Sequence, residues 1–141
     1  MSNFTATKSI VINATPAKVW DALTKPEVVR QYMFGAEVIS DWQKGSSLTY
    51  KGVWEGKPFE DKGVILEIEP AKILKATYLS ALSGLEDKPE NYNTVTYELT
   101  PAGNSTKLTV TQDNLRSQDG ANHTAKNWEM VLGTIKQLLE S

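Results

Sequence analysis

Residues 124–140 read TAKNWEMVLGTIKQLLE, and the apolar side chains among them recur at the spacing of a helix. These side chains are Trp128, Val131, Leu132, Ile135, Leu138 and Leu139. They form a wide apolar stripe on a helix that runs from about Thr124 to the end of the chain. Asp119 or Asn122 could cap its start. The stripe indicates that one side of this helix packs against the rest of the protein.

The middle of the sequence is typical of a sheet. Short runs rich in β-branched and aromatic residues are separated by turn signals, of which the clearest are Lys44-Gly45 and the segment 101–104. The runs predict strands near residues 36–41, 46–54, 59–68, 72–80, 92–100 and 105–112. Consecutive short strands joined by tight turns indicate an antiparallel meander.

The first third of the sequence predicts a strand and two short helices. Residues 5–13 are rich in β-branched side chains, Thr15 can cap a helix at Pro16, and Pro26 opens a second helix that ends at Gly35. A sheet this large must curl. The expected fold class is therefore α+β: a curved antiparallel sheet of six to seven strands, with the long C-terminal helix over its concave face. That helix cannot pack closely along its whole length, so a cavity is expected beneath it.

Composition excludes several classes of protein. The formal net charge is −2, and the basic side chains are scattered, whereas nucleic-acid binding needs a clustered basic face. Cysteine is absent, which excludes disulfides and thiolate metal sites. The N-terminus does not resemble a signal peptide, and no apolar run approaches the ~20 residues that span a bilayer. We expect one domain, residues 1–141, in the cytoplasm, with no membrane span and no nucleic-acid partner.

Catalytic patterns are absent from the sequence. His123 is the only histidine, and a place on the surface or at a helix start is favoured over a role as a general base. No nucleophile elbow or phosphate-binding glycine loop is present. Strict alternation from Val64, Leu66 and Ile68 places Glu67 on the outward face of its strand. No catalytic residue, metal site or cofactor is therefore expected.

Aromatic side chains in the predicted sheet indicate a binding cavity instead. An apolar wall interrupted by tyrosine hydroxyls suits a mostly apolar ligand that a few polar groups orient. Core packing is the alternative for these side chains, and it is favoured for Trp128. The candidate lining residues are Met33, Tyr50, Trp54, Phe59, Tyr78, Tyr97, Val110, Gln112, Trp128 and Val131.

Two segments could close such a cavity. Met33 and Phe34, at the end of the second short helix, could form a lid or a hydrophobic plug. Residues 80–93 form a long polar connection that could gate the cavity or simply join two strands.

One stretch resembles a known family. Residues 12–27, INATPAKVWDALTKPE, are similar to the N-terminal signature of the START-like, pollen-allergen-like superfamily (SRPBCC). Within it they resemble the branch related to the C-terminal domain of the activator of the heat-shock-protein-90 ATPase. Further matches lie in residues 63–68, 94–101, 106–111 and 127–140. The resemblance implies a helix-grip fold. Members bind lipids, steroids or other apolar molecules, act as cyclases or hydrolases, or bind protein partners.

Three functions follow as hypotheses. The first is binding of a small apolar or amphipathic molecule, such as a lipid, sterol or polyketide, between the sheet and the C-terminal helix. The second is a protein-interaction module with a partner such as a chaperone. The third is a cyclase- or hydrolase-like enzyme, which needs at least two titratable groups that converge inside the cavity.

Overall fold

The computed structural model describes residues 4–33, 35–80 and 85–140. In chain order its elements are β1 (Phe4–Ile12), α1 (Pro16–Thr24), α2 (Pro26–Tyr32), β2 (Glu37–Ser40), β3 (Ser47–Trp54), β4 (Lys57–Glu69), β5 (Ile73–Tyr78), the 3-10 turn η2 (Pro89–Asn91), β6 (Asn93–Ala102), β7 (Ser105–Leu115) and α3 (Gln118–Glu140). Every predicted strand and helix is present, with ends that differ by a few residues.

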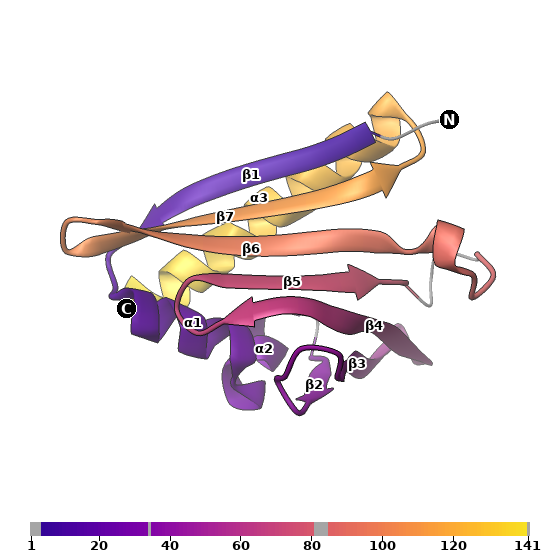
Figure 1. Ribbon diagram of the computed structural model, residues 1–141, viewed down its shortest axis with the longest axis horizontal. Helices are drawn as coiled ribbons and strands as arrows, with labels where there is room; N and C mark the ends of the chain where they lie inside the picture. The colour runs from indigo at the N-terminus through magenta and orange to yellow at the C-terminus, as the bar shows by residue number, and fades with distance from the viewer. Residues whose placement is uncertain (1–3, 34, 81–84, 141) are drawn as a thin grey trace.

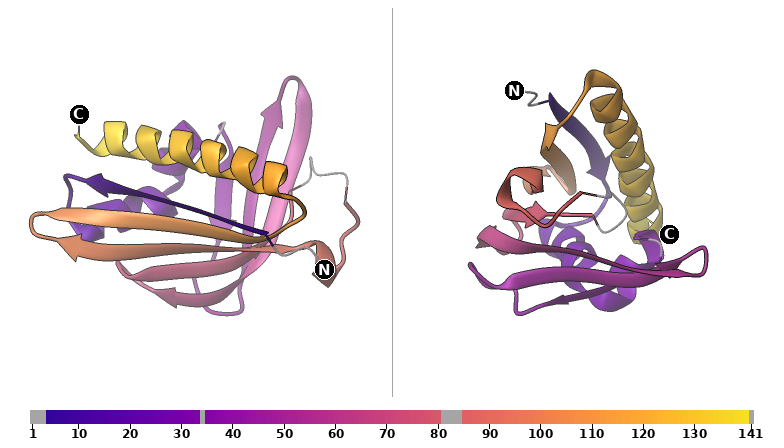
Figure 2. Two further views of the ribbon diagram at one scale, coloured as in Figure 1. Left: turned by 90° about the horizontal axis from the view of Figure 1, so that it is seen from above. Right: turned by 90° about the vertical axis from the view of Figure 1, so that its right-hand side faces the viewer.

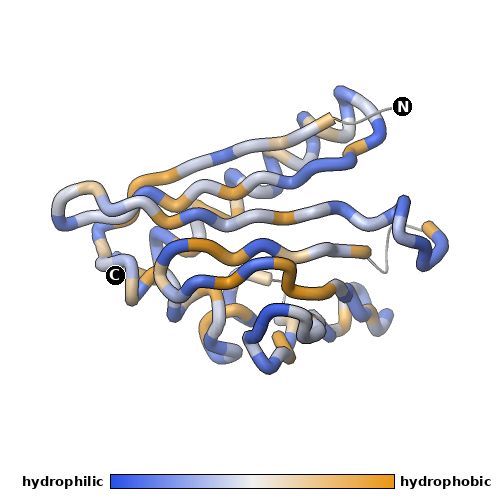
Figure 3. The backbone as a smooth tube through the Cα atoms, in the orientation of Figure 1, coloured by the Kyte–Doolittle hydropathy of each residue, from blue (hydrophilic) through white to orange (hydrophobic). Residues whose placement is uncertain are grey.

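The strands form one antiparallel sheet in the order β1-β7-β6-β5-β4-β3-β2 (Figure 1). Apolar and polar residues alternate along them (Figure 3), because successive side chains point to opposite faces of a strand. The sheet curves around α3, which crosses its concave side (Figure 2). The predicted α+β helix-grip architecture is thereby confirmed.

The start of α3 differs from the expectation. The helix begins at Gln118, so Asp119 and Asn122 lie inside it and neither is the cap. Ser117 takes that role, because its Oγ accepts a hydrogen bond from the backbone N–H of Gly120 at 2.9 Å. The earlier start adds more than one turn to the helix.

β4 changes partner along its length and carries two irregularities. Its first part pairs with β3 and its last part with β5. A β-bulge between Ile65 and Glu67 adds one residue to β4, which breaks the simple alternation. Val64 and Leu66 are therefore 42% and 40% exposed, whereas Ile65 is 1% exposed. The prediction that Val64 and Leu66 face the core was wrong, while Glu67 is exposed as expected.

The main core lies between the sheet and the three helices. Ile12, Val19, Val29, Leu108 and Ile135 are all fully buried there. The hydroxyl of Tyr32 donates a hydrogen bond to the carbonyl oxygen of Ala22 at 2.7 Å, which ties α2 to α1. These two helices lie beside the C-terminal end of α3 (Figure 1).

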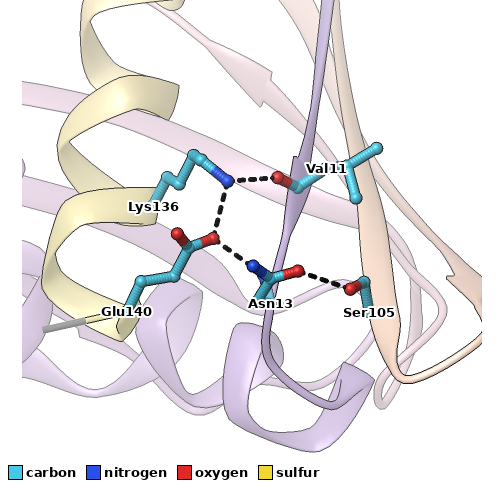
Figure 4. A network of polar contacts seen from close by, with 5 residues as sticks. All are labelled: Val11, Asn13, Ser105, Lys136 and Glu140. Carbon is cyan, nitrogen blue, oxygen red and sulfur yellow. Dashed lines mark hydrogen bonds and ion pairs between the residues drawn. The ribbon is translucent and has the colours of Figure 1, made fainter.

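A polar network fastens the C-terminal end of α3 to β1 (Figure 4). The Glu140 carboxylate accepts hydrogen bonds from the backbone N–H of Asn13 at 2.8 Å and from Lys136 Nζ at 2.6 Å. Lys136 Nζ also donates to the carbonyl oxygen of Val11 at 2.8 Å. Ser105 Oγ donates to Asn13 Oδ1 at 2.7 Å, which extends the network to β7. The backbone hydrogen bond from Asn13, and then Lys136, lower the pKa of Glu140.

This network predicts a pH-dependent contribution to stability. A carboxyl group whose pKa is lowered by folding stabilises the protein above its unfolded pKa, and the contribution is lost as the pH falls through the folded pKa. We expect Glu140→Gln to lower the urea midpoint at about pH 7, and the difference from the unmodified protein to shrink toward about pH 3. Glu98→Gln, on an exposed side chain of β6, is the control. A difference that stays constant over this range would contradict the assignment.

Candidate functional site

A cavity of about 750 Å³ lies between the sheet and α3. Strands β3 to β7 supply one wall, and residues 123–131 of α3 supply the opposite wall. Eight of the candidate residues line it: Met33, Tyr50, Phe59, Tyr78, Tyr97, Gln112, Trp128 and Val131. The helix therefore spans the concave face without filling it.

Of the other two candidates, the structure places Val110 away from the cavity and leaves Trp54 untested. Val110 is fully buried and does not line the cavity. It is the cross-strand partner of Tyr97 and of Lys8, and the ammonium group of Lys8 lies 3.3 Å from the Glu129 carboxylate on α3. This contact places α3 over β1 beside this part of β7, and Val110 packs in the core. Trp54 ends β3, but its side chain lies outside the described part of the structure.

The structure adds lining residues that the sequence pattern did not single out. They are Leu48, Asp61, Ala76, Thr77, Ser80, Val95, His123, Thr124 and Asn127. His123, Asn127 and Val131 are spaced four residues apart, which places them on one side of α3. This spacing is visible in the sequence, but the predicted helix start at Thr124 left out residues 118–123 and so left out His123.

A chain of hydrogen bonds holds Trp128 against the cavity. Its indole N–H donates to Gln112 Oε1 at 2.9 Å, and Gln112 Nε2 donates to Asn93 Oδ1 at 3.1 Å. The Trp128 ring also meets Tyr97 edge-to-face, with ring centroids 5.7 Å apart and an angle of 85° between the planes. The hydrogen bond satisfies the one polar atom of this large aromatic side chain, and the ring contact fixes its orientation, so Trp128 forms an ordered wall.

The tyrosine hydroxyls supply some of the polar groups in the cavity lining. Tyr78 donates a hydrogen bond from its hydroxyl to Asp61 Oδ2 at 2.9 Å. Tyr50 and Tyr97 are each only 7% exposed, and neither hydroxyl has a hydrogen-bond partner among the residues that the structure describes. Burial raises the pKa of all three tyrosines, so these phenols stay protonated. Two of them are therefore available to donate or accept a hydrogen bond.

The segments expected to close the cavity are described in part. Met33 lines the cavity, whereas Phe34 lies outside the described residues. Ser80 also lines it, and residues 81–84 are likewise outside the described range. The following residues are tied down, because the Tyr92 hydroxyl donates to Asp87 Oδ1 at 2.6 Å and Asp87 pairs with Lys62.

Metal binding finds no support in the described residues. Within 4–33, 35–80 and 85–140, no cluster of three or more His, Asp or Glu side chains is placed to hold a metal ion. None of the helices described there combines the length and apolar character that crossing a bilayer requires.

A curved antiparallel sheet that holds a long C-terminal helix over a cavity defines a helix-grip α+β protein. The family model for activator of Hsp90 ATPase homolog 1-like proteins matches residues 13–140. The chain belongs to this family, which confirms the resemblance carried by residues 12–27.

Solved structures share the fold. A protein from Cytophaga hutchinsonii, determined in solution, is 42% identical over 99% of this chain and 97% of its own, with a TM-score of 0.86. The Aha1 dimer from Colwellia psychrerythraea is 21% identical over 99% of this chain and 97% of its own, with a TM-score of 0.75. Ara h 8.0201 is 12% identical over 99% of each chain, with a TM-score of 0.76. The last two show the fold alone. A comparison with curated proteins finds no match.

Proposed function

We propose that this protein binds a small, mostly apolar molecule in the cavity between the sheet and α3. The observation that carries the proposal is a cavity of about 750 Å³ into which two buried tyrosines bring hydroxyls without partners among the described residues. Pockets for small molecules commonly measure roughly 300–1,000 Å³ and combine apolar walls with a few polar groups. Tyr50 and Tyr97 would supply those groups, and Trp128 and Phe59 would supply apolar contact.

Ligand binding should raise thermal stability. We would screen lipids, sterols and aromatic polyketides by thermal shift, and confirm each ligand by NMR. A ligand at ten times its Kd should add about 1.4 kcal/mol to the free energy of unfolding. For a domain of this size that corresponds to a rise of about 4 °C in Tm.

A variant with a filled cavity separates binding inside from binding outside. Val95 lines the cavity, so Val95→Phe should abolish the shift. Val53 is 63% exposed on the outer face, so Val53→Phe makes the same chemical change there and should leave the shift intact. The proposal fails if no compound shifts the Tm, or if the shift survives in Val95→Phe.

A protein partner is the second function that the family suggests. The structure does not favour the outer sheet face as a binding surface for such a partner, because the exposed apolar side chains of Val53 and Val64 are not neighbours. Lys51 and Glu60 lie between them and form an ion pair of 3.4 Å. Among the described residues of β3 and β4, charge thus interrupts the apolar surface that such an interface needs.

A further inference from the structure

Two phenol hydroxyls in the cavity wall have no hydrogen-bond partner within the described part of the chain. They belong to Tyr50 on β3 and Tyr97 on β6, which both line the cavity and are each 7% exposed. The hydroxyl of Tyr78 differs, because it donates to Asp61 Oδ2 at 2.9 Å. No side-chain nitrogen or oxygen of the described residues is both fully enclosed and without a partner. The hydroxyls of Tyr50 and Tyr97 therefore open onto the cavity itself.

These two hydroxyls face the same part of the cavity, although β4 and β5 separate their strands. Because the sheet curves around α3 (Figure 2), side chains from distant strands converge over its concave side. The electrostatics agrees with this convergence: after burial, a charge on Tyr50 is the largest cause that raises the pKa of Tyr97. Such an effect weakens with distance, so the two phenol oxygens lie near each other. One polar group of a ligand can therefore meet both hydroxyls.

A buried phenol that keeps its hydrogen needs an acceptor for it. Burial raises the pKa of Tyr50 and of Tyr97, so both stay protonated at neutral pH. A carbonyl oxygen has two lone pairs and no hydrogen, so it accepts from both phenols and adds no donor that needs a partner. A ligand hydroxyl instead brings a further hydrogen into the cavity, where a donor without a partner is costly. The phenol pair therefore favours a carbonyl.

A charged acceptor fits this position less well. Among the described lining residues there is no lysine or arginine, and the basic side chain is that of His123, an exposed residue of α3. A carboxylate that pairs with this imidazole stays at the water-exposed part of the cavity and leaves both phenol hydrogens unpaired. A carboxylate at the phenols is instead desolvated beside apolar side chains such as Ala76 and Val95, which is costly for a full charge. An uncharged acceptor avoids both penalties.

We propose that the ligand is an uncharged carbonyl compound, whose oxygen accepts hydrogen bonds from the phenols of Tyr50 and Tyr97 while its apolar body lies between the sheet and α3. This inference rests on the proposed function and names the chemical class of the ligand. The Trp128 ring beside Tyr97 is already held by Gln112 and by the edge-to-face contact, so this wall is ordered before a ligand arrives. A preorganised wall lowers the entropic cost of binding.

Four compounds that share a naphthalene ring test the proposal. They are acetylnaphthalene, its alkene isostere isopropenylnaphthalene, naphthylethanol and naphthoic acid, all substituted at the same ring position. NMR titration of the Trp128 indole N–H at neutral pH gives each Kd and reports whether the compound occupies the cavity. We expect the ketone to bind about threefold more tightly than the alcohol and about tenfold more tightly than the acid.

Removal of each phenol hydroxyl assigns the effect to a side chain. Tyr50→Phe and Tyr97→Phe keep the ring and delete one donor, so each should weaken binding of the ketone about fivefold and leave the Kd of the alkene within about twofold. Tyr32→Phe is the matched control, because the Tyr32 hydroxyl donates to the Ala22 carbonyl and does not line the cavity. This control should leave both Kd values unchanged.

The carbonyl group itself gives a second readout. Hydrogen bonds to a ketone oxygen move the NMR signal of its carbonyl carbon to higher frequency. With an isotope label at that carbon, the signal of acetylnaphthalene should move in this direction on binding, and it should move less in Tyr50→Phe and in Tyr97→Phe. This measurement on the unmodified protein decides even where a variant does not fold.

The outcomes separate this proposal from the proposed function. If the alkene binds in the cavity and the two cavity variants weaken the ketone no more than the alkene, the carbonyl proposal is overturned and the proposed function stands. Tighter binding of the alcohol or of the acid than of the ketone also overturns it, as does a carbonyl signal that does not move on binding. If neither this set nor the broader panel binds, the proposed function falls, and the carbonyl proposal falls with it.

Discussion

Gly63→Ala should destabilise the protein by about 3 kcal/mol, or prevent its folding. A Cβ atom on Gly63 would lie 1.7 Å from the carbonyl oxygen of Thr77 and 2.4 Å from its carbonyl carbon. Both are backbone atoms of β5, so no side-chain rotation relieves the overlap. The Thr77 hydroxyl also accepts a hydrogen bond from the Val64 N–H at 2.8 Å, so separation of the strands would break a further contact.

Urea denaturation measures this effect, and another glycine provides a matched control. Gly133 lies in α3, and a Cβ atom there would meet nothing within 4 Å. Gly133→Ala should therefore stabilise the protein by up to about 1 kcal/mol, because alanine has the higher helix propensity. Equal midpoints for Gly63→Ala and the unmodified protein would show that β4 and β5 do not approach so closely.

Ile135→Ala should lower the free energy of unfolding by about 4 kcal/mol. Ile135 is fully buried at the end of α3 that packs with α1 and α2 in the main core. Truncation removes the apolar contact and leaves a space that close-packed neighbours cannot refill. A typical domain is stable by only about 5–15 kcal/mol, so this one change should remove a large fraction of the total.

The exposed side of the same helix supplies the control for this prediction. Met130 is 55% exposed, and Met130→Ala should change stability by less than about 0.5 kcal/mol. A similar loss for both variants would show that α3 is not held through its apolar stripe. Denaturation by urea, followed by tryptophan fluorescence, measures both.

Much of the fold could be predicted because its signals are local. The alternation in residues 105–112 and the spacing of Leu132 and Ile135 each depend on one element, so β7 and α3 were found. The candidate site was recovered in part. Tyr50, Tyr97 and Trp128 were proposed as lining residues because aromatic side chains stand out in a sheet, and the structure places them around the cavity. Their role in binding a ligand stays a prediction.

What could not be predicted depends on contacts between distant segments. The bulge between Ile65 and Glu67 changes which residues of β4 face inward, and no composition signal marks it. An alternation that starts from inward-facing Val64 and Leu66 assigns Asp61 to the outer face. The sequence therefore did not predict that Asp61 lines the cavity. Val110 has the same pattern as a lining residue, but it packs in the main core.

The amino-acid order alone specified the elements, their succession and the apolar side of α3, because periods of two and 3.6 residues follow from backbone geometry. The assembled fold specified the cavity, its lining and the pairing of Tyr78 with Asp61. Those features require the register of neighbouring strands and the path of α3 across them, and both are set by packing between residues far apart in the chain.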